Sequence, residues 1–333
     1  MSATSSKAAG GSSAKPKIFI DGDAGTTGLE IRERLAALAD VDVVSIDPAK
    51  RKDAAARQEA MREADLVVLC LPDDAAREAV ALADKLGAGA PRILDASTAH
   101  RVAPGWVYGF AELDSQQPEK IASAQRVTNP GCYPTGAIAL IRPLVDAGIL
   151  PPDYPLTINA VSGYSGGGRK MIEDYEAGTA PAFELYGLAL DHKHVPEIEH
   201  YSKLSRRPIF VPSVGNFRQG MLVSVPLHLD TLPGQPALAD IEKALEERHP
   251  GGHPISVHRG AGKTSRLPLS EHASETMDLF VLGDPDRKQA VLAARLDNLG
   301  KGAAGAAVQN IKLMLGLDGP RQGKQAAGKR QPA

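Results

Sequence analysis

The chain has 333 residues, of which 43% are hydrophobic and 23% charged, a mix typical of a globular protein of about two domains. It carries 38 Lys and Arg against 40 Asp and Glu, so its formal net charge at pH 7 is −2. This balance argues against nucleic-acid and membrane-surface binding, which need a basic excess. The longest apolar run, residues 66–71, is far shorter than the roughly 18 residues of a membrane span. Two cysteines exclude a disulfide scaffold and a four-cysteine zinc site.

The first part of the chain alternates strand and helix patterns. A Gly-, Ser- and Ala-rich stretch at 1–15 has no apolar core suited to a secretory signal, so we expect a flexible tail on a cytosolic protein. Apolar runs then predict strands at 17–20, 41–46, 66–71 and 92–95. Charged stretches with apolar or Ala residues at helical spacing predict helices at 29–38, 49–64 and 74–86. This alternation predicts a parallel sheet with helices on both faces.

The pattern changes after about residue 128, where helices become fewer. Strands are predicted at 156–162, 209–214 and 221–228. They indicate a second, α+β domain over 129–299 with a mixed or antiparallel sheet. A small-residue helix at 303–315 is expected to return to the first domain, which then comprises 16–128 and 300–317. Residues 319–333 are expected to form another flexible tail.

A glycine-rich turn joins the first predicted strand to the first predicted helix. Its glycines follow the spacing G-x-x-G-x-x-G instead of the commoner G-x-G-x-x-G. Glycines there let the backbone approach a dinucleotide pyrophosphate at the helix N-terminus. We therefore predict a Rossmann-like dinucleotide site, with a plain tight turn as the alternative. The candidate cofactor contacts are Gly22, Ala24, Gly25, Thr26, Thr27 and Gly28.

The residues after the second predicted strand leave the choice between NAD and NADP open. Asp47 is placed to bind the ribose 2′-hydroxyl of NAD. The basic cluster Lys50, Arg51 and Lys52 follows at once and suits the 2′-phosphate of NADP. A solvated helix start is the third interpretation.

Cys132 is a candidate nucleophile. It lies in Asn129-Pro-Gly-Cys-Tyr-Pro-Thr-Gly136, just before an apolar helix predicted at 137–144. A helix N-terminus carries partial positive charge and free N–H donors, so this position favours a thiolate. The same donors can stabilise an oxyanion on a bound carbonyl. Cys70 lies within an apolar strand and is expected to be an inert core residue.

A nucleophilic thiol needs a nearby proton acceptor. His192 and His194, in Asp191-His-Lys-His-Val-Pro-Glu197, are the candidates. Two histidines two residues apart share one face of a strand, an arrangement that also occurs in metal sites. No cysteine or third histidine is close in sequence, so we predict no metal. In the acid/base interpretation one histidine acts on the substrate, and Glu197 orients it or the substrate amine.

The glycine-rich loop, the thiol segment and the His-Lys-His-x-Pro-Glu segment, together and in this order, resemble the N-acetyl-γ-glutamyl-phosphate reductase family of arginine biosynthesis. The opening Phe19-Ile-Asp-Gly-Asp-Ala-Gly-Thr-Thr-Gly-Leu29 is similar to the shorter branch of that family. The resemblance covers residues 17–317. It implies an α/β fold in which a Rossmann-like parallel-sheet domain is joined to an α+β catalytic and oligomerisation domain, as in aspartate-semialdehyde dehydrogenase.

The resemblance also implies a mechanism. Cys132 is expected to attack the γ-acyl carbonyl of N-acetyl-γ-glutamyl phosphate, release phosphate and form a thioester. Hydride from NADPH then reduces the thioester, and proton transfer through His194, supported by Glu197, releases N-acetylglutamate 5-semialdehyde.

Further contacts follow from the same resemblance. The implied substrate contacts are Arg101, whose guanidinium suits the phosphate, Asn129 and Arg169. The implied NADP contacts outside the glycine-rich loop are Arg51, Ser97, Ser162, Gly163 and Asn310. The family further suggests a cytoplasmic homodimer or homotetramer that acts on a small acyl phosphate.

Two alternatives stay open. A related acyl-phosphate or semialdehyde dehydrogenase, such as the aspartate type, needs the same thiol and cofactor and differs only in substrate. An NADP-binding sensor without catalytic activity belongs to another class, and the presence of both Cys132 and His194 argues against it.

Overall fold

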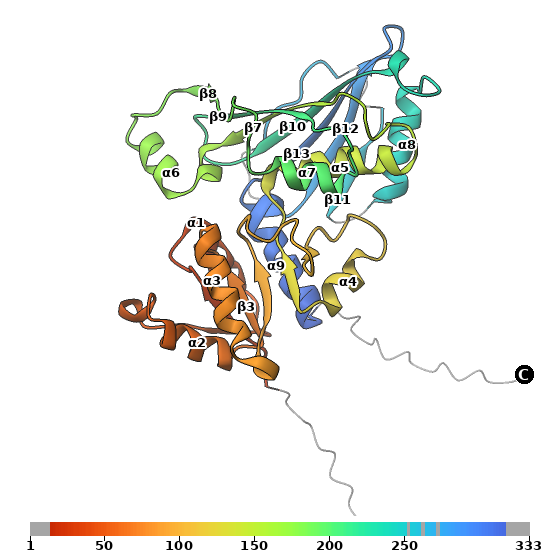
Figure 1. Ribbon diagram of the computed structural model, residues 1–333. Helices are drawn as coiled ribbons and strands as arrows, with labels where there is room; N and C mark the ends of the chain where they lie inside the picture. Colours follow the sequence, from red (N-terminus) through yellow and green to blue (C-terminus); the bar gives the residue numbers. More distant parts are fainter. Residues whose placement is uncertain (1–13, 252–253, 261–263, 271–273, 318–333) are drawn as a thin grey trace, which may run out of the picture.

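The computed structural model describes residues 14–251, 254–260, 264–270 and 274–317, and two sheets joined by helices make up the fold (Figure 1). The tails predicted at 1–15 and 319–333 lie outside the described residues, except for residues 14 and 15. Within the described ranges, no helix combines the length and the apolar character needed to cross a membrane.

A six-stranded, wholly parallel sheet with strand order β2-β1-β3-β4-β6-β5 forms the N-terminal part. Its strands are β1 (Lys17–Asp21), β2 (Asp42–Val44), β3 (Leu66–Leu69), β4 (Arg92–Asp95), β5 (Val107–Tyr108) and β6 (Arg126–Thr128). Its helices are α1 (Thr26–Ala36), α2 (Ala54–Glu63), α3 (Asp73–Asp84) and α4 (Gln117–Ser123). The predicted parallel sheet is confirmed. The helix predicted at 49–64 begins later, because Asp53 caps the start of α2 by accepting a hydrogen bond from the Ala56 N–H.

Side-chain alternation along the central strands gives this sheet two apolar cores. Ile18 and Ile20 of β1 are buried with α1, α4 and the last helix, α9 (Gly305–Leu315). Phe19, between them, is buried on the other face with α2 and α3. The helix predicted at 303–315 is therefore present as α9, and it packs on the first sheet (Figure 1).

A mixed seven-stranded sheet follows, with strand order β11-β12-β13-β10-β7-β9-β8. Its strands are β7 (Thr157–Gly163), β8 (Phe183–Leu185), β9 (Ile209–Gly215), β10 (Met221–His228), β11 (Ile255–His258), β12 (Met277–Asp284) and β13 (Gln289–Leu296). The accompanying helices are α5 (Cys132–Asp146), α6 (Arg169–Glu176), α7 (Val195–Tyr201) and α8 (Leu238–Arg248). Apolar side chains of α5 fill the core between this sheet and α7 and α8, so the start of α5 is held between the two sheets. The predicted α/β fold with a mixed second sheet is confirmed.

Candidate active site

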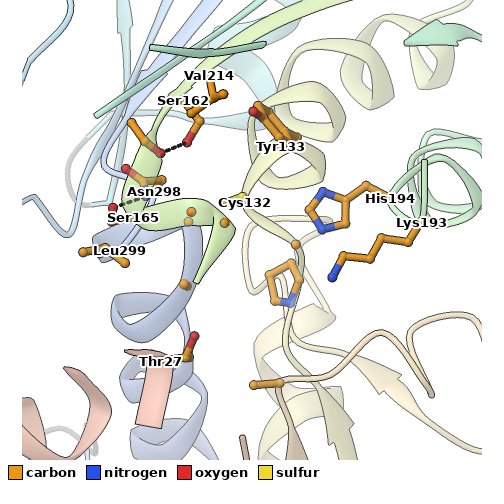
Figure 2. Close-up of a pocket in the computed structure, with 18 of the residues that line it drawn as sticks. Thr27, Cys132, Tyr133, Ser162, Ser165, Lys193, His194, Val214, Asn298 and Leu299 are labelled. Carbon is orange, nitrogen blue, oxygen red and sulfur yellow. Dashed lines mark hydrogen bonds between the residues drawn. The ribbon is translucent and has the colours of Figure 1, made fainter. Parts of the chain in front are cut away.

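A cavity of about 300 Å³ lies between the two sheets, where β6 ends and α5 begins. Both sheets contribute to its walls (Figure 2). Thr27 comes from α1, Cys132 from α5, Ser162 from β7 and His194 from the turn before α7. Ligands of parallel α/β sheets bind at this edge, outside the carboxyl ends of the strands.

Cys132 is the first residue of α5, and no side chain among the described residues caps this helix start at Gly131. Burial raises the pKa of the Cys132 thiol to about 11, and the nearby Arg101 guanidinium opposes this shift only in part. The helix end acts in the predicted direction, because hydrogen bonds from the backbone N–H groups of Cys132 and Tyr133 lower the pKa of the thiol. Desolvation of the charged form outweighs the helix end, so attack by Cys132 requires a proton acceptor.

His194 is placed to be that acceptor. Its ring is directed toward Cys132 (Figure 2) and is only 7% exposed. A Cβ atom at Gly131 would lie 2.8 Å from His194 Nε2, 2.7 Å from Glu197 Oε1 and 2.6 Å from Arg101 Nη1. Three functional side chains therefore converge on the residue before the thiol, where only glycine leaves room. Burial, and then the Arg101 charge, hold the pKa of His194 well below its usual value, so the imidazole is neutral and has a ring nitrogen free to take a proton, although the same shift makes it a weaker base.

The two histidines do not share a strand face, and that prediction is wrong. Both lie in the turn before α7, because Pro196 occupies the first turn of that helix and starts it directly after His194. The His194 backbone N–H donates to His192 Nδ1 at 3.1 Å, and the ring centroids are 4.8 Å apart. Among the described residues, no group of three or more His, Cys, Asp or Glu side chains is arranged to hold a metal ion.

Glu197 is buried and binds three partners. It accepts hydrogen bonds from Arg101 Nη1 at 2.5 Å, the Tyr108 hydroxyl at 2.8 Å and the Gly131 N–H at 3.1 Å. None of the hydrogen bonds found in the described parts of the chain joins Glu197 to His194. The expectation that Glu197 orients the histidine directly is therefore corrected. It holds Arg101 and the backbone next to Cys132 instead.

Arg101 and Asn129 both line the cavity, where the resemblance placed substrate contacts. Arg101 Nε donates to the Asn129 carbonyl at 3.1 Å. Asn129 Nδ2 donates to the Ala303 carbonyl at 3.0 Å, and its Oδ1 accepts from Asn310 at 3.0 Å. Asn310 is buried behind Asn129 and is not among the residues that line the cavity, and its predicted contact with the nicotinamide stays a prediction.

Four other predicted residues are distributed differently. Ser162 and Gly163 line the cavity together with Cys132. Ser97 is buried, donates to Asp95 Oδ2 at 2.8 Å and is absent from the cavity lining. Arg169 is exposed at the start of α6, and its guanidinium donates to the Ala24 carbonyl. This contact places Arg169 beside the glycine-rich loop and away from the residues that line the cavity with Cys132, and the predicted substrate contact of Arg169 stays a prediction.

The glycine-rich loop borders a second cavity of about 250 Å³ that fits part of a dinucleotide. Gly22 has φ of +96°, and a Cβ atom there would meet the Cys70 carbonyl. Gly25 is the N-cap residue of α1, and no side chain of the described residues caps that end. The backbone donors of α1 are thus available for a pyrophosphate. The cavity is lined in part by Gly22, Asp23, Ala24, Gly25, Ser45, Arg51, Lys52 and Cys70.

Two expectations about this cavity are refined. Cys70 lines it and is half-buried, so it is not a full core residue, although burial raises the pKa of its thiol to about 12 and keeps it protonated. Asp47 accepts a hydrogen bond from the Ala49 N–H at 3.0 Å and does not line the cavity. Arg51 does line it, 3.3 Å from Asp23.

Sequence reasoning missed two residues of the site. Tyr108 lies on the two-residue strand β5, where nothing in the local pattern marks it as a partner of Glu197. Lys193 lines the first cavity beside His194 (Figure 2). Its charge within the His-Lys-His segment was a signal that could have been used.

Two family matches cover most of the chain. Residues 17–124 match the semialdehyde dehydrogenase NAD binding domain, and residues 132–298 match the semialdehyde dehydrogenase dimerisation domain. Among solved structures, aspartate semialdehyde dehydrogenase II from Vibrio cholerae has a TM-score of 0.67 at 16% identity, covering 91% of this chain and 99% of the other. The Candida albicans aspartate semialdehyde dehydrogenase with NADP has a TM-score of 0.60 at 12% identity, covering 90% and 98%. At these identities the likeness concerns the fold alone.

Curated relatives are much closer in sequence. The N-acetyl-gamma-glutamyl-phosphate reductases of Brucella ovis and Brucella suis are each 54% identical to this chain over 310 residues, covering 91% of it and 99% of the relative. The match therefore spans both sheets and the two cavities between and beside them. The chain belongs to the semialdehyde dehydrogenase family and, within it, to the N-acetyl-γ-glutamyl-phosphate reductases.

Proposed function

We propose that this protein uses NADPH to reduce N-acetyl-γ-glutamyl phosphate to N-acetylglutamate 5-semialdehyde and phosphate, as an enzyme of arginine biosynthesis. The observation that carries the proposal is the convergence of Cys132, a neutral His194 and the Arg101–Glu197 ion pair around Gly131. A protonated thiol beside a neutral imidazole is a nucleophile with its base. The relatives that match over nearly the whole chain carry this reaction in their name.

The first half of the reaction uses this chain's own groups. His194 takes the thiol proton as Cys132 sulfur attacks the acyl carbonyl, and the carbon–oxygen bond to phosphate breaks to leave a thioester. The backbone N–H groups of Cys132 and Tyr133 at the start of α5, which bond the thiol at rest, are the donors that the oxyanion formed during the attack would use. Arg101 lines the same cavity and offers guanidinium N–H groups to the departing phosphate.

The second half returns the proton. NADPH, when bound, supplies the hydride that reduces the thioester. His194, which holds the proton from the first half, gives it back to the Cys132 sulfur as the carbon–sulfur bond breaks and the aldehyde leaves. Ser162 and Gly163, which line the cavity beside Cys132, and the glycine-rich loop would hold the cofactor.

Three observations support NADP over NAD. Asp47, the candidate partner of the NAD ribose, is used to cap a turn. Ser45, directly after β2, lines the cavity, and its small side chain leaves room for the 2′-phosphate of NADP. Arg51 and Lys52 line the same cavity and supply positive charge.

Replacing Arg51 with Met is expected to raise the KM for NADPH by about 10- to 100-fold, because one charge-assisted hydrogen bond to the 2′-phosphate is lost. The KM for NADH should stay within about twofold, since NADH has no such phosphate. The matched control is Arg62→Met, which removes an exposed arginine paired with Glu59 on α2. Equal increases in both KM values would show that Arg51 does not read the phosphate.

We further propose that the protein is a homodimer or homotetramer and acts in the cytoplasm. Its residues 132–298 match a dimerisation domain. Large apolar side chains are exposed along the edge strand β8 and beside it, and these are Phe183, Leu185, Leu188, Leu190 and Ile209. Both cysteines are free, and a reducing compartment keeps a nucleophilic thiol in that form.

The test of the proposed function is the reverse reaction. With N-acetylglutamate 5-semialdehyde, phosphate and NADP, we expect a phosphate-dependent rise in NADPH absorbance. Aspartate semialdehyde should give no comparable rise, which separates this activity from the aspartate-type enzymes that share the thiol and the cofactor. If neither aldehyde gave a signal, a sensor without catalytic activity would be favoured.

A further inference from the structure

A buried cation lies directly behind one wall of the active-site cavity. The wall is the single π-helical turn Gly300–Ala304, between β13 and α9. Gly302 and Ala303 line the cavity, whereas Lys301 lies on the other side with its side chain only 2% exposed. Isolated π-helical turns are rare and are frequent at functional sites.

All three protons of the Lys301 ammonium have partners. Nζ donates to Glu112 Oε1 at 2.9 Å, to Glu112 Oε2 at 2.8 Å and to Gln309 Oε1 at 2.7 Å. Gln309 Nε2 donates to Glu112 Oε1 at 2.7 Å, which closes the network. We call these three residues the Lys301 cluster. It links the loop after β5, the π-helical turn and α9.

A buried ion pair of this kind is weak support for a purely stabilising role. Removing two charges from water costs about as much as their attraction returns, so apolar residues would often serve stability as well. A network that joins three separate segments instead determines where those segments lie. The relevant segment here is the π-helical turn, because it contacts the reacting residue.

On its cavity side the turn touches both halves of the site. A Cβ atom at Gly302 would lie 3.0 Å from the Cys132 Cβ, so this backbone packs directly on the nucleophile. The neighbouring Ala303 carbonyl accepts the hydrogen bond from Asn129. Just before the turn, Asn298 donates to Ser165 Oγ at 2.9 Å, in the loop after β7 (Figure 2).

We propose that Lys301, Glu112 and Gln309 are positioning residues that hold the π-helical turn against Cys132 and Asn129. The turn covers the thiol and spaces it from the loop after β7. Because reaction rates depend steeply on the placement of reacting groups, a displaced turn lowers the rate of the chemical step. The expected effect on the reaction rate rests on the proposed function. The expected shielding of the Cys132 thiol by the π-helical turn does not depend on it.

The main test is Lys301→Met, which keeps an unbranched side chain one atom shorter and removes the charge. We expect kcat to fall about tenfold or more, while the dissociation constant for NADPH stays within about threefold. We also expect iodoacetamide to alkylate Cys132 about threefold faster or more at a fixed pH, because the turn no longer packs on it. Alkylation is measured by mass spectrometry and requires no substrate.

The matched control is Arg92→Met on β4, where the Arg92 guanidinium reaches the far end of α9. Arg92 donates to the carbonyls of Ala122, Ala124 and Met314, so it pins α9 to α4 away from the cavity. This variant should also lower the melting temperature, although less than Lys301→Met, because it leaves no buried carboxylate without its cation. Its kcat and its rate of Cys132 alkylation should match the parent within about twofold.

A milder variant covers the case in which Lys301→Met does not fold. Gln309→Met keeps the ion pair but removes two hydrogen bonds, and we expect a kcat about threefold lower with faster alkylation. Parent-like kcat and alkylation in the folded variants would overturn the inference. If the parent lacked the proposed activity, the alkylation rates alone would still test whether the Lys301 cluster holds the turn against Cys132. Failure of this inference is therefore distinguishable from failure of the proposed function.

Discussion

Replacing Cys132 with Ala is expected to lower kcat by about 10⁴-fold or more, because no thioester can form and hydride has no acyl group to reduce. NADPH binding should remain within about twofold of the parent, since the glycine-rich loop and its cavity are untouched. Steady-state assays in the reverse direction give the first quantity, and NADPH fluorescence titration gives the second. Turnover in the variant close to the parent value would show that the mechanism is wrong.

The pH dependence of Cys132 alkylation in the parent protein tests whether the thiol needs a proton acceptor. Burial raises the pKa of the Cys132 thiol to about 11, so the thiolate fraction at neutral pH is small. As the pH rises toward that value, the thiolate fraction increases about tenfold for each pH unit. The rate of alkylation at Cys132 in the parent should therefore climb through pH 8, 9 and 10 without levelling off. A plateau near pH 8 would mean that the thiol is already ionised there, and that His194 is not needed to take its proton.

Replacing Glu197 with Gln is expected to have the second largest effect. The carboxylate is 1% exposed and accepts from Arg101, Tyr108 and the Gly131 N–H, whereas an amide keeps the shape but loses the charge and half of the acceptors. Breaking a buried pair leaves Arg101 without compensation, which costs about 3 kcal/mol of stability. We expect kcat/KM to fall about 100-fold or more as Arg101 and Gly131 lose their positions.

Alkylation distinguishes a specific electrostatic role of Glu197 from a general loss of order. The Glu197 charge contributes to the raised pKa of the Cys132 thiol, so its removal should lower that pKa and speed alkylation at pH 8 while turnover falls. Glu199→Gln, on the same helix, is the matched control. The Glu199 side chain is 34% exposed, and its carboxylate lies 3.9 Å from the Arg207 guanidinium, beyond hydrogen-bond distance. Similar losses in both variants would contradict a specific role for Glu197.

Local pattern was sufficient for much of the fold. The alternation of apolar strands with charged helices predicted the parallel sheet, since period and turn chemistry are properties of neighbouring residues. The position of Cys132 at the start of a helix followed from the apolar run after it and from Pro134 in the first turn. The resemblance selected His194 over His192 and added the candidate role of Arg101.

Burial and distant pairing decided the rest. Glu197 pairs with Arg101 across 96 residues, and Lys301 pairs with Glu112 across 189, so no local window contains either pair. The sequence by itself determined which chemical groups are present and that Cys132 and the glycine-rich loop each lie at the start of a helix. Only the tertiary structure decided that the Cys132 thiol rests protonated, because its pKa depends on how much water the surrounding elements exclude.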